Sequence, residues 1–482
     1  MDQVSLRPGA AAEERSGPLV VTGHPLQRAG AWAVSALAGQ AAPDHVTVDD
    51  LNAVAKTIGA DAARAAVAEK THARYDWWKV LFTLYPNSKV THAGRSHDET
   101  VLRDALSAMF APDGAAGTAL PCTFCGTPSK TVWAKSTLPM FDTNKALNTL
   151  PPGVRGWPVC RGCRVAMWAL PYGSWVTAGS ATVLSCEGWQ AERKFAVSNV
   201  RRARRIIHAG FSALGPGARP ELVTLHALRA VGSGRSATTL WSFKNDNQEP
   251  WLRVTRTRRA VPAFLAAVDG NAPLRRGWRL LEMALTQQDR NGQVSVSGPG
   301  EAARLLFEAE DGRGRSLLGQ VHQLLWDTER WSSQDRAALT RLAFSYEKEV
   351  YGVEPDLRGV ATLIADWIEH GSGSARGRLA EYRNAGLNGY RLGSLLYQAS
   401  FRLKLDGRPA AIGADAWRPF VERRPRAWEQ RMLLAAEVLA LLDQRGVEVG
   451  KQPEDDRERE RIEHLVQQPV MSVDDDYYFG GA

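Results

Sequence analysis

Apolar residues recur at three- and four-residue spacing through the last third of the chain, which is the pattern of amphipathic helices. Four such segments stand out, and each ends with a glycine that can terminate a helix. The segments are RAALTRLAFSYEKEVYG, DLRGVATLIADWIEHG, NGYRLGSLLYQASFRLKLDG and RAWEQRMLLAAEVLALLDQRG. The pattern therefore predicts a C-terminal α-helical bundle over residues 301–470.

The first part of the chain mixes helical periodicity with turns. Thr47 is a residue type that caps helix N-termini, and it precedes a helical pattern. The stretch LYPNSKVTH, at residues 84–92, interrupts the helical pattern with a turn. We expect a flexible tail over residues 1–17 and an N-terminal α/β region over residues 18–120.

Helical periodicity largely disappears between residues 112 and 188, where Gly, Pro, Cys and Trp recur every few positions. Further on, the helical stretch NVRRARRIIHAGFSAL precedes the strand-like TTLWSF and PWLRVTRT. The pattern predicts a four-cysteine zinc module over residues 121–175, a basic α+β region over 176–300, and an acidic tail over 471–482 that contains VDDDYYFGGA. The predicted fold class is α+β, with a zinc-ribbon-like module inserted in a mixed N-terminal region.

Length and hydropathy restrict the class of protein. With 482 residues the chain can form two to four domains with real apolar cores. No run of about 18 uncharged apolar residues occurs, which argues against a transmembrane helix. The first residues lack the basic start, apolar middle and cleavage site of a secretory signal, so we expect a cytoplasmic protein with reduced cysteines.

Positive charge is concentrated in one segment. Residues 190–290 hold 18 Lys and Arg against 7 Asp and Glu, whereas the whole chain has a net charge of +8. Such a segment suits a polyanion such as nucleic acid. The alternative is a solvated, Arg-rich surface without a partner.

Four of the five cysteines form two Cys-x-x-Cys pairs, Cys122/Cys125 and Cys160/Cys163, separated by 34 residues. Two such pairs can supply four thiolates to one tetrahedral zinc ion. The spacer is longer than in the usual pattern, but it is rich in turns. The alternatives are a thioredoxin-like redox pair or two unrelated dithiols, and a catalytic zinc is disfavoured because a four-sulfur shell leaves no place for water. We expect structural Zn²⁺ at the pairs and a buried apolar role for Cys186.

Arginines in the basic segment are the candidate contacts to phosphates, which give affinity without sequence choice. They are Arg201, Arg202, Arg204, Arg205, Arg253, Arg256, Arg258 and Arg259. Polar residues on predicted loops are the candidate readers of base edges. They are Lys244, Asn245, Asn247 and Gln248, with Asn87 and Lys89 as a second set. Each reader can instead be an ordinary turn residue.

No motif predicts catalysis. His97-Asp98 is the sole His-Asp pair, and no further metal ligands follow it at helical spacing. The chain has no Gly-Lys-Ser/Thr phosphate loop and no Gly-x-Ser-x-Gly elbow. Asp474–Asp476 can chelate a metal weakly, although a solvated tail is the better interpretation. We expect a protein that is not an enzyme.

Four stretches in order resemble a known family. They are PLVVTGHPLQRAG (18–30), LYPNSKVTH (84–92), the cysteine pairs with WALPYG (168–173), and LWSFKNDNQEPWLRV (240–254). Together they resemble the large subunit of type I-B CRISPR surveillance complexes (Cascade), the Cas-eight family. The resemblance covers about the first 250 residues. The chain departs from the family pattern at His24, where Asn is usual, at Tyr85, where Phe is usual, and at Asp246-Asn247.

The resemblance implies a non-catalytic subunit that sits with a backbone protein and a repeat-handle protein on a CRISPR RNA. Such a subunit reads a short motif beside the target in double-stranded DNA and helps to hold the opened strands, while RNA pairing provides sequence specificity. A recruited helicase–nuclease is a further partner that it allows, and no membrane is involved. Two other classes remain: a stand-alone zinc-ribbon nucleic-acid-binding regulator, and a scaffold whose arginines contact acidic protein faces.

Overall fold

The computed structural model describes most of the chain between residues 17 and 447. The described range excludes 116, 135, 140–155, 215–218, 230, 231, 233, 246–248, 310–315, 328, 329, 372, 373 and 410–412. The predicted flexible tail, except for Gly17, and the acidic tail lie outside the described residues.

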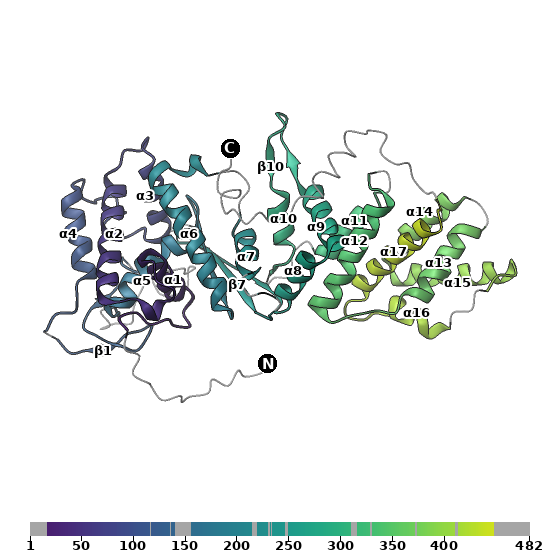
Figure 1. The fold of residues 1–482 in the computed structure, drawn as a ribbon, viewed down its shortest axis with the longest axis horizontal. Helices are drawn as coiled ribbons and strands as arrows, with labels where there is room; N and C mark the ends of the chain where they lie inside the picture. Colours follow the sequence, from purple (N-terminus) through teal and green to yellow (C-terminus); the bar gives the residue numbers. More distant parts are fainter. Residues whose placement is uncertain are drawn as a thin grey trace. The chain divides into compact units, whose positions relative to one another are not determined.

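The fold is mixed α+β, with many helices and small sheets, so the predicted fold class is confirmed in its coarse form (Figure 1). The chain forms two compact units. Unit 1 comprises residues 1–214 and 239–254, and unit 2 comprises residues 215–238 and 255–482. Among the described residues, no helix has the length and apolar character needed to cross a membrane.

The described residues of unit 1 form six α-helices and several short strands. Local signals explain the helix ends: the Thr47 side chain and Asp50 form a reciprocal capping box, and α1 ends at Gly39, whose φ of 74° favours glycine. The helices are α1 Pro25–Ala38, α2 Val48–Val67, α3 Arg74–Leu84, α4 Glu99–Phe110, α5 Arg161–Gly173 and α6 Trp189–Ala209, with short 3₁₀ turns at Pro43–His45 and Phe211–Ala213.

The strands in the described part of unit 1 form two small pairs and contribute to one larger sheet, in which β7 begins and β8 ends with residues assigned to unit 2. The pairs are antiparallel, β1 with β2 and β3 with β4. In the larger sheet β6 lies between β5 and β7, and β7 is followed by β8. The strands are β1 Leu120–Pro121, β2 Pro128–Ser129, β3 Val132–Trp133, β4 Trp157–Pro158, β5 Trp175–Val176, β6 Ala181–Cys186, β7 Thr238–Lys244 and β8 Trp251–Thr257.

Helix α5 is the centre of unit 1, and all of its residues from Gly162 to Gly173 are buried. It packs along α1, and the two helices run side by side in Figure 1. Trp168 of α5 stacks on Tyr85 with ring centroids 4.4 Å apart, and the Tyr85 hydroxyl donates a hydrogen bond to the Met167 carbonyl. The turn predicted at residues 84–92 is thereby anchored to the central helix.

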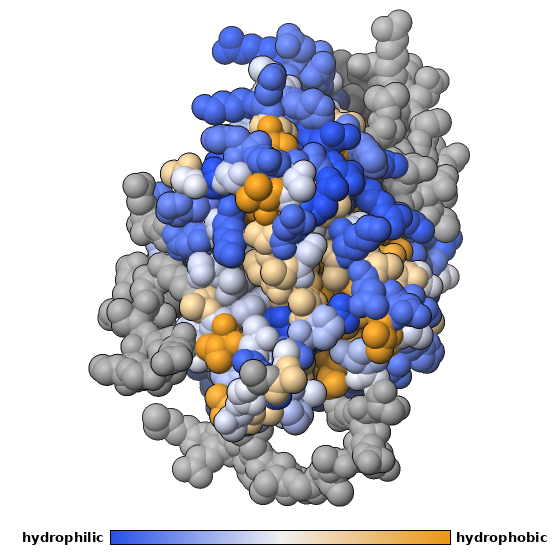
Figure 2. Space-filling view, turned by 90° about the vertical axis from the view of Figure 1, so that its left-hand side faces the viewer, coloured by the Kyte–Doolittle hydropathy of each residue, from blue (hydrophilic) through white to orange (hydrophobic). Residues whose placement is uncertain are grey.

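The molecular surface differs from this buried core. On the face drawn in Figure 2, hydrophobic residues are spread as several small groups among hydrophilic ones.

Gly30 allows the close approach of α1 to α5. A Cβ added at Gly30 would lie 1.9 Å from the backbone oxygen of Ala166, which cannot move without shifting α5. We expect Gly30→Ala to destabilise unit 1 by about 3 kcal/mol, the upper range of overpacking, because the two helix backbones must separate. Thermal unfolding followed by circular dichroism measures this. Gly23→Ala is the matched control, because nothing lies within 4 Å of its added Cβ, and equal melting temperatures for the two variants would refute the close packing.

Unit 2 consists largely of helices, and the four segments with helical periodicity form α12, α13, α15 and α17. Helix α17 is buried along most of its length and packs against α11, α12, α13 and α16. The helices are α7 Pro220–Leu228, α8 Val261–Gly270, α9 Ala272–Leu285, α10 Gly298–Arg304, α11 Leu317–Leu325, α12 Ser333–Tyr346, α13 Arg358–His370, α14 Ala375–Ala385, α15 Gly389–Leu405, α16 Ala414–Val421 and α17 Ala427–Gln444, with a π-helical turn at Glu347–Tyr351. The short strands are β9 Gln287–Gln288, β10 Val294–Val296 and β11 Glu308–Ala309.

Candidate metal centre and basic surface

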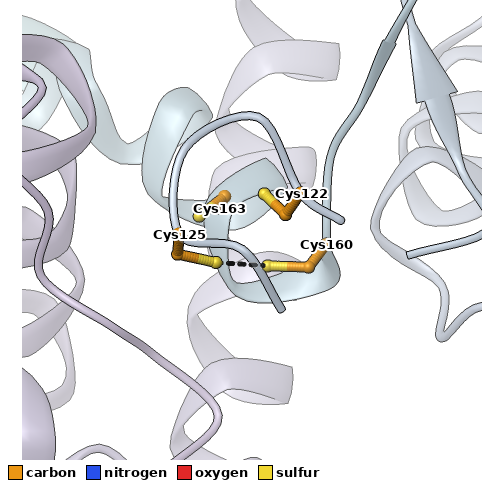
Figure 3. A group of neighbouring side chains, drawn as sticks. All are labelled: Cys122, Cys125, Cys160 and Cys163. Carbon is orange, nitrogen blue, oxygen red and sulfur yellow. Dashed lines mark hydrogen bonds between the residues drawn. The ribbon is translucent and has the colours of Figure 1, made fainter. Parts of the chain in front are cut away.

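The four cysteines of the two Cys-x-x-Cys pairs converge on one point in unit 1 (Figure 3). All four sulfur atoms lie within 4.8 Å of one another, and the Sγ atoms of Cys125 and Cys160 are 3.5 Å apart. Cys122, Cys160 and Cys163 are buried, and Cys125 is half-buried. The predicted convergence is confirmed, and the cluster can bind a metal ion.

The first cysteine pair lies in the tight turn between β1 and β2. The backbone N–H of Cys122 donates to the Thr127 carbonyl at 2.9 Å, and the N–H of Gly126 donates to the Cys122 carbonyl at 2.9 Å. Gly126 has a φ of 78°, which glycine adopts without strain. These bonds hold both sulfurs on the inner side of the turn.

The second cysteine pair lies at the start of α5. Cys160 is the N-cap residue, and Cys163 lies in the first turn, where exposed N–H groups favour negative charge. Thr123 N–H donates to the Pro158 carbonyl at 2.9 Å, and Val159 N–H donates to the Thr131 carbonyl at 2.9 Å. The strand pairing that precedes α5 therefore brings the two cysteine pairs together.

The electrostatics of the cluster favour a cation. Hydrogen bonds from the neighbouring thiols, that from Cys125 first, lower the pKa of Cys122. The interactions with Cys122 and then with the other two cysteines, together with burial, raise the pKa of Cys163. Four thiols this close cannot all ionise beside one another unless a cation offsets their repulsion. Four sulfur donors in one cluster are the ligand set of structural zinc and of iron–sulfur sites.

Two buried polar residues lie at or beside the cluster, and neither was predicted from the sequence. Gln27 Nε2 lies 3.6 Å from Cys163 Sγ and donates to the Val20 carbonyl at 2.6 Å. Arg164 donates to the carbonyls of Met109 and Ala111 at 2.6 and 2.9 Å. Arg164 could have been considered because it directly follows Cys163, whereas no local signal links Gln27 to the cysteines.

Other candidate ligands have structural roles or lie outside the described residues. Asp98 caps α4, accepting a hydrogen bond from Thr100 N–H at 2.7 Å. Cys186 is buried, as expected. Asp474–Asp476 lie outside the described residues. Within the described part of the chain, no second group of three or more His, Cys, Asp or Glu is close enough to hold a metal ion.

Helix α6 carries a basic stripe on its exposed side. Arg201 and Arg204 are exposed and Arg205 is half-buried. Arg193 and Lys194, which are not among the predicted phosphate contacts, are exposed about two turns earlier on the same helical face. We define the α6 basic stripe as Arg193, Lys194, Arg201, Arg204 and Arg205.

Arg202 corrects the predicted phosphate-contacting set. Its guanidinium is buried, lies 3.9 Å from the centre of the Trp175 ring, and donates to the Val176 carbonyl at 2.6 Å. Burial lowers the pKa of Arg202 to about 10. Arg202 therefore anchors α6 to β5 and does not face a phosphate.

The buried side of α6 is held by Glu192. Its carboxylate accepts hydrogen bonds from Arg28 Nε at 2.7 Å, Trp32 Nε1 at 3.0 Å and Cys186 N–H at 3.0 Å. We expect Glu192→Gln to destabilise unit 1 by about 3 kcal/mol, because the Arg28 charge loses its partner in a mostly buried place. Urea unfolding measures this. Asp104→Asn is the control, because Asp104 is an exposed residue of α4. A Glu192 variant that is no less stable than this control would contradict the stabilising role of Glu192.

The second group of predicted arginines lies in β8 and directly after it. Arg253 and Arg256 are both exposed, and Arg256 lies on the face of the strand opposite to the buried Thr255 and Thr257. Arg258 Nε donates to Glu308 at 2.8 Å, and its guanidinium lies over the Tyr351 ring. Arg259 is exposed. Arg253 belongs to unit 1, whereas Arg256, Arg258 and Arg259 belong to unit 2.

The predicted base readers differ in their surroundings. Asn245 is half-buried and structurally tied, because its Nδ2 donates to the Leu84 carbonyl at 2.9 Å and its N–H donates to Thr83. Asn87 and Lys244 are half-buried, and Lys89 is exposed. Asn247 and Gln248 lie outside the described residues. The Asn245 contact brings the stretches at 84–92 and 240–254 together in unit 1.

Comparisons with models of protein families, with curated proteins and with solved structures give no match to this chain.

Proposed function

We propose that this protein is the non-catalytic large subunit of a type I CRISPR RNA-guided surveillance complex. In this proposal it recognises the protospacer-adjacent motif in double-stranded DNA and binds the target during R-loop formation in antiviral defence. The observation that carries the proposal is the α6 basic stripe, which suits a phosphate backbone. The ordered motifs of unit 1 supply the second line of support.

The dimensions of the α6 basic stripe fit a nucleic-acid backbone. Arg193 and Arg205 are separated by about 18 Å along the helix at 1.5 Å per residue. That length matches about five phosphates of one DNA strand at 3.4 Å rise each. The acidic residue of this segment, Glu192, is buried and paired with Arg28, so it does not offset the stripe.

The motif-reading part of the proposal rests on the surface around residues 84–92. The exposed Lys89 can donate to guanine edges in the major groove. Asn245 ties the segment 240–254 to Leu84, and Lys244 is the residue directly before Asn245. We assign Asn245 mainly to positioning and Lys89 to base contact.

We further propose that the cysteine cluster holds structural Zn²⁺ and that the helices over residues 301–470 form a bundle that lines the opened DNA. A closed shell of four sulfurs offers zinc no open position for catalysis. The metal would fasten the β1–β2 turn to the start of α5, where the hydrogen bonds of Thr123 and Val159 already join the two cysteine pairs. No catalytic step is assigned to the protein.

Affinity purification from the native host tests the proposal. We expect the tagged chain to carry repeat-flanked spacer RNA together with the backbone and repeat-handle proteins. A metal-bound chain without RNA that binds DNA with its own sequence preference would favour the stand-alone zinc-ribbon regulator. Partner binding that nuclease treatment leaves intact, with no RNA recovered, would favour the protein scaffold.

A further inference from the structure

A groove in unit 2 has no role in the function proposed above. It lies between the first half of α15 and the segment that leads from α16 into α17, and its volume is ≈ 1240 Å³. Small-molecule sites span about 300–1,000 Å³, so this groove has room for a peptide segment. Tyr390, Tyr397 and Trp428 line it and are 88%, 66% and 45% exposed.

The aromatic side of the groove continues along α15. Tyr390, Tyr397, Phe401 and Leu405 share one helical face and are all exposed. The opposite face of α15 is buried through Leu392, Leu396 and Leu403 and neighbouring apolar residues. A row of exposed large apolar side chains on one helix marks an interaction surface.

The other side of the groove is basic. Arg423, Arg424, Arg426 and Arg431 line it together with Glu422 and Glu429. Arg424 is paired with Glu422 at 2.8 Å, and Arg426 with the buried Glu347 at 2.6 Å.

Two of the groove arginines retain binding capacity. Arg423 makes no ion pair within the described part of the chain, and it is exposed. Arg431 donates through Nη1 to the Phe420 carbonyl at 2.8 Å. Its Nε is buried without a hydrogen-bond partner among the described residues. The groove therefore offers aromatic faces beside a modest positive charge.

We infer that the acidic tail of the same chain docks in this groove through residues 474–479, Asp-Asp-Asp-Tyr-Tyr-Phe. The three carboxylates complement the two arginines that retain binding capacity, and the three aromatic rings match the three exposed aromatic side chains that line the groove. This inference goes beyond the proposed nucleic-acid function and does not depend on it.

The length of the chain permits this docking. Helix α17 begins at the groove and its 18 residues extend about 27 Å along the helix axis. Gly446 and Asp474 are 28 positions apart, and a chain of that length reaches at most about 90 Å when fully extended. This reach exceeds the length of α17, so the tail can return to the groove and compete as an intramolecular ligand.

Peptide binding in two full-length proteins tests the inference. The probe is a fluorescently labelled synthetic peptide of residues 471–482, and its binding is followed by fluorescence anisotropy. One protein is the unchanged chain, and the other carries Tyr477→Ser, Tyr478→Ser and Phe479→Ser. Because the unchanged tail competes from within its own chain, we expect the peptide to bind the tail variant at least tenfold more tightly.

Groove variants made in the tail variant locate the binding site. Tyr397→Ser with Arg423→Glu should weaken peptide binding at least tenfold, because an aromatic and a cationic contact are lost together. Val101→Ser with Arg103→Glu on α4 is the matched control and should leave binding unchanged. All four positions are exposed, and circular dichroism checks that each variant folds.

Four outcomes would overturn the inference. The first two are that the peptide binds neither protein, or that it binds both with equal affinity. The third is that the groove variant and the control variant lose the same amount of peptide affinity. The fourth is that light scattering shows a dimer that the tail substitutions abolish. The last would mean that the tail docks on a second copy. A single-stranded oligonucleotide that binds the groove where the peptide does not would identify nucleic acid as the occupant instead.

Discussion

Cys160→Ser is expected to lower the metal content of the purified protein and to lower the stability of unit 1 by at least about 3 kcal/mol. The substitution removes one of four sulfurs that all lie within 4.8 Å of one another, and metal binding free energy is folding free energy where the site forms only in the folded chain. The loss should be smaller than the roughly 10–16 kcal/mol of an isolated zinc finger, because unit 1 also has the apolar core around α5. Elemental analysis of the purified protein and calorimetric unfolding measure the two effects.

Cys186→Ser is the matched control for this prediction. Cys186 is also buried and lies at the end of β6, but it does not belong to the cluster. We expect this variant to keep its full metal content. If Cys160→Ser retained the same metal content and the same melting curve as the unchanged protein, the metal centre would be excluded. Elemental analysis also identifies the metal, with zinc as the proposed ion.

Replacing Arg201 and Arg204 together with Ala is expected to weaken binding to DNA of every sequence. The loss should be on the order of 10–100-fold at about 0.1 M salt, because each lost phosphate contact leaves a counterion on the DNA. The slope of log K against log salt should become shallower by about 1.8, which is about 0.9 for each contact. Titrations of mixed-sequence duplexes at several salt concentrations measure both quantities.

Arg64→Ala with Arg103→Ala is the matched control for the α6 basic stripe. Both arginines are exposed in unit 1 and both lie near Glu99, which offsets their charge. We expect this variant to keep the slope of the unchanged protein. A loss confined to one target motif would show that Arg201 or Arg204 reads bases, and an unchanged slope would remove the stripe from the binding surface.

The sequence pattern predicted the cysteine cluster because Cys-x-x-Cys is a local signal. A turn or a helix start brings two sulfurs two residues apart to the same side, whatever the rest of the fold does. The partner residue Gln27 could not be found in this way. It is 136 positions from Cys163, and only the packing of α1 against α5 brings the two side chains together.

The helical periodicity of α6 could have distinguished its buried arginine from its exposed arginines, which their close spacing in the sequence did not do. Arg202 lies on the same helical face as Phe195 and Ile206, both of which are buried. Arg193 and Lys194 lie eight and seven positions before Arg201, on the same helical face as Arg201. The density of arginines alone therefore predicted a basic helix, but it wrongly placed the buried Arg202 among the phosphate contacts.

The sequence by itself determined the α+β class, the helices of the last third and the two Cys-x-x-Cys motifs that form the cluster. Each of these depends on the spacing of residues over a short segment of the chain. Tertiary structure alone decided that residues 239–254 join unit 1 and that Asn245 is tied to Leu84. It also decided that α15 and the segment before α17 enclose a groove. These features depend on contacts between residues far apart in the chain, and a linear pattern of apolar and polar positions carries no record of which distant surfaces meet.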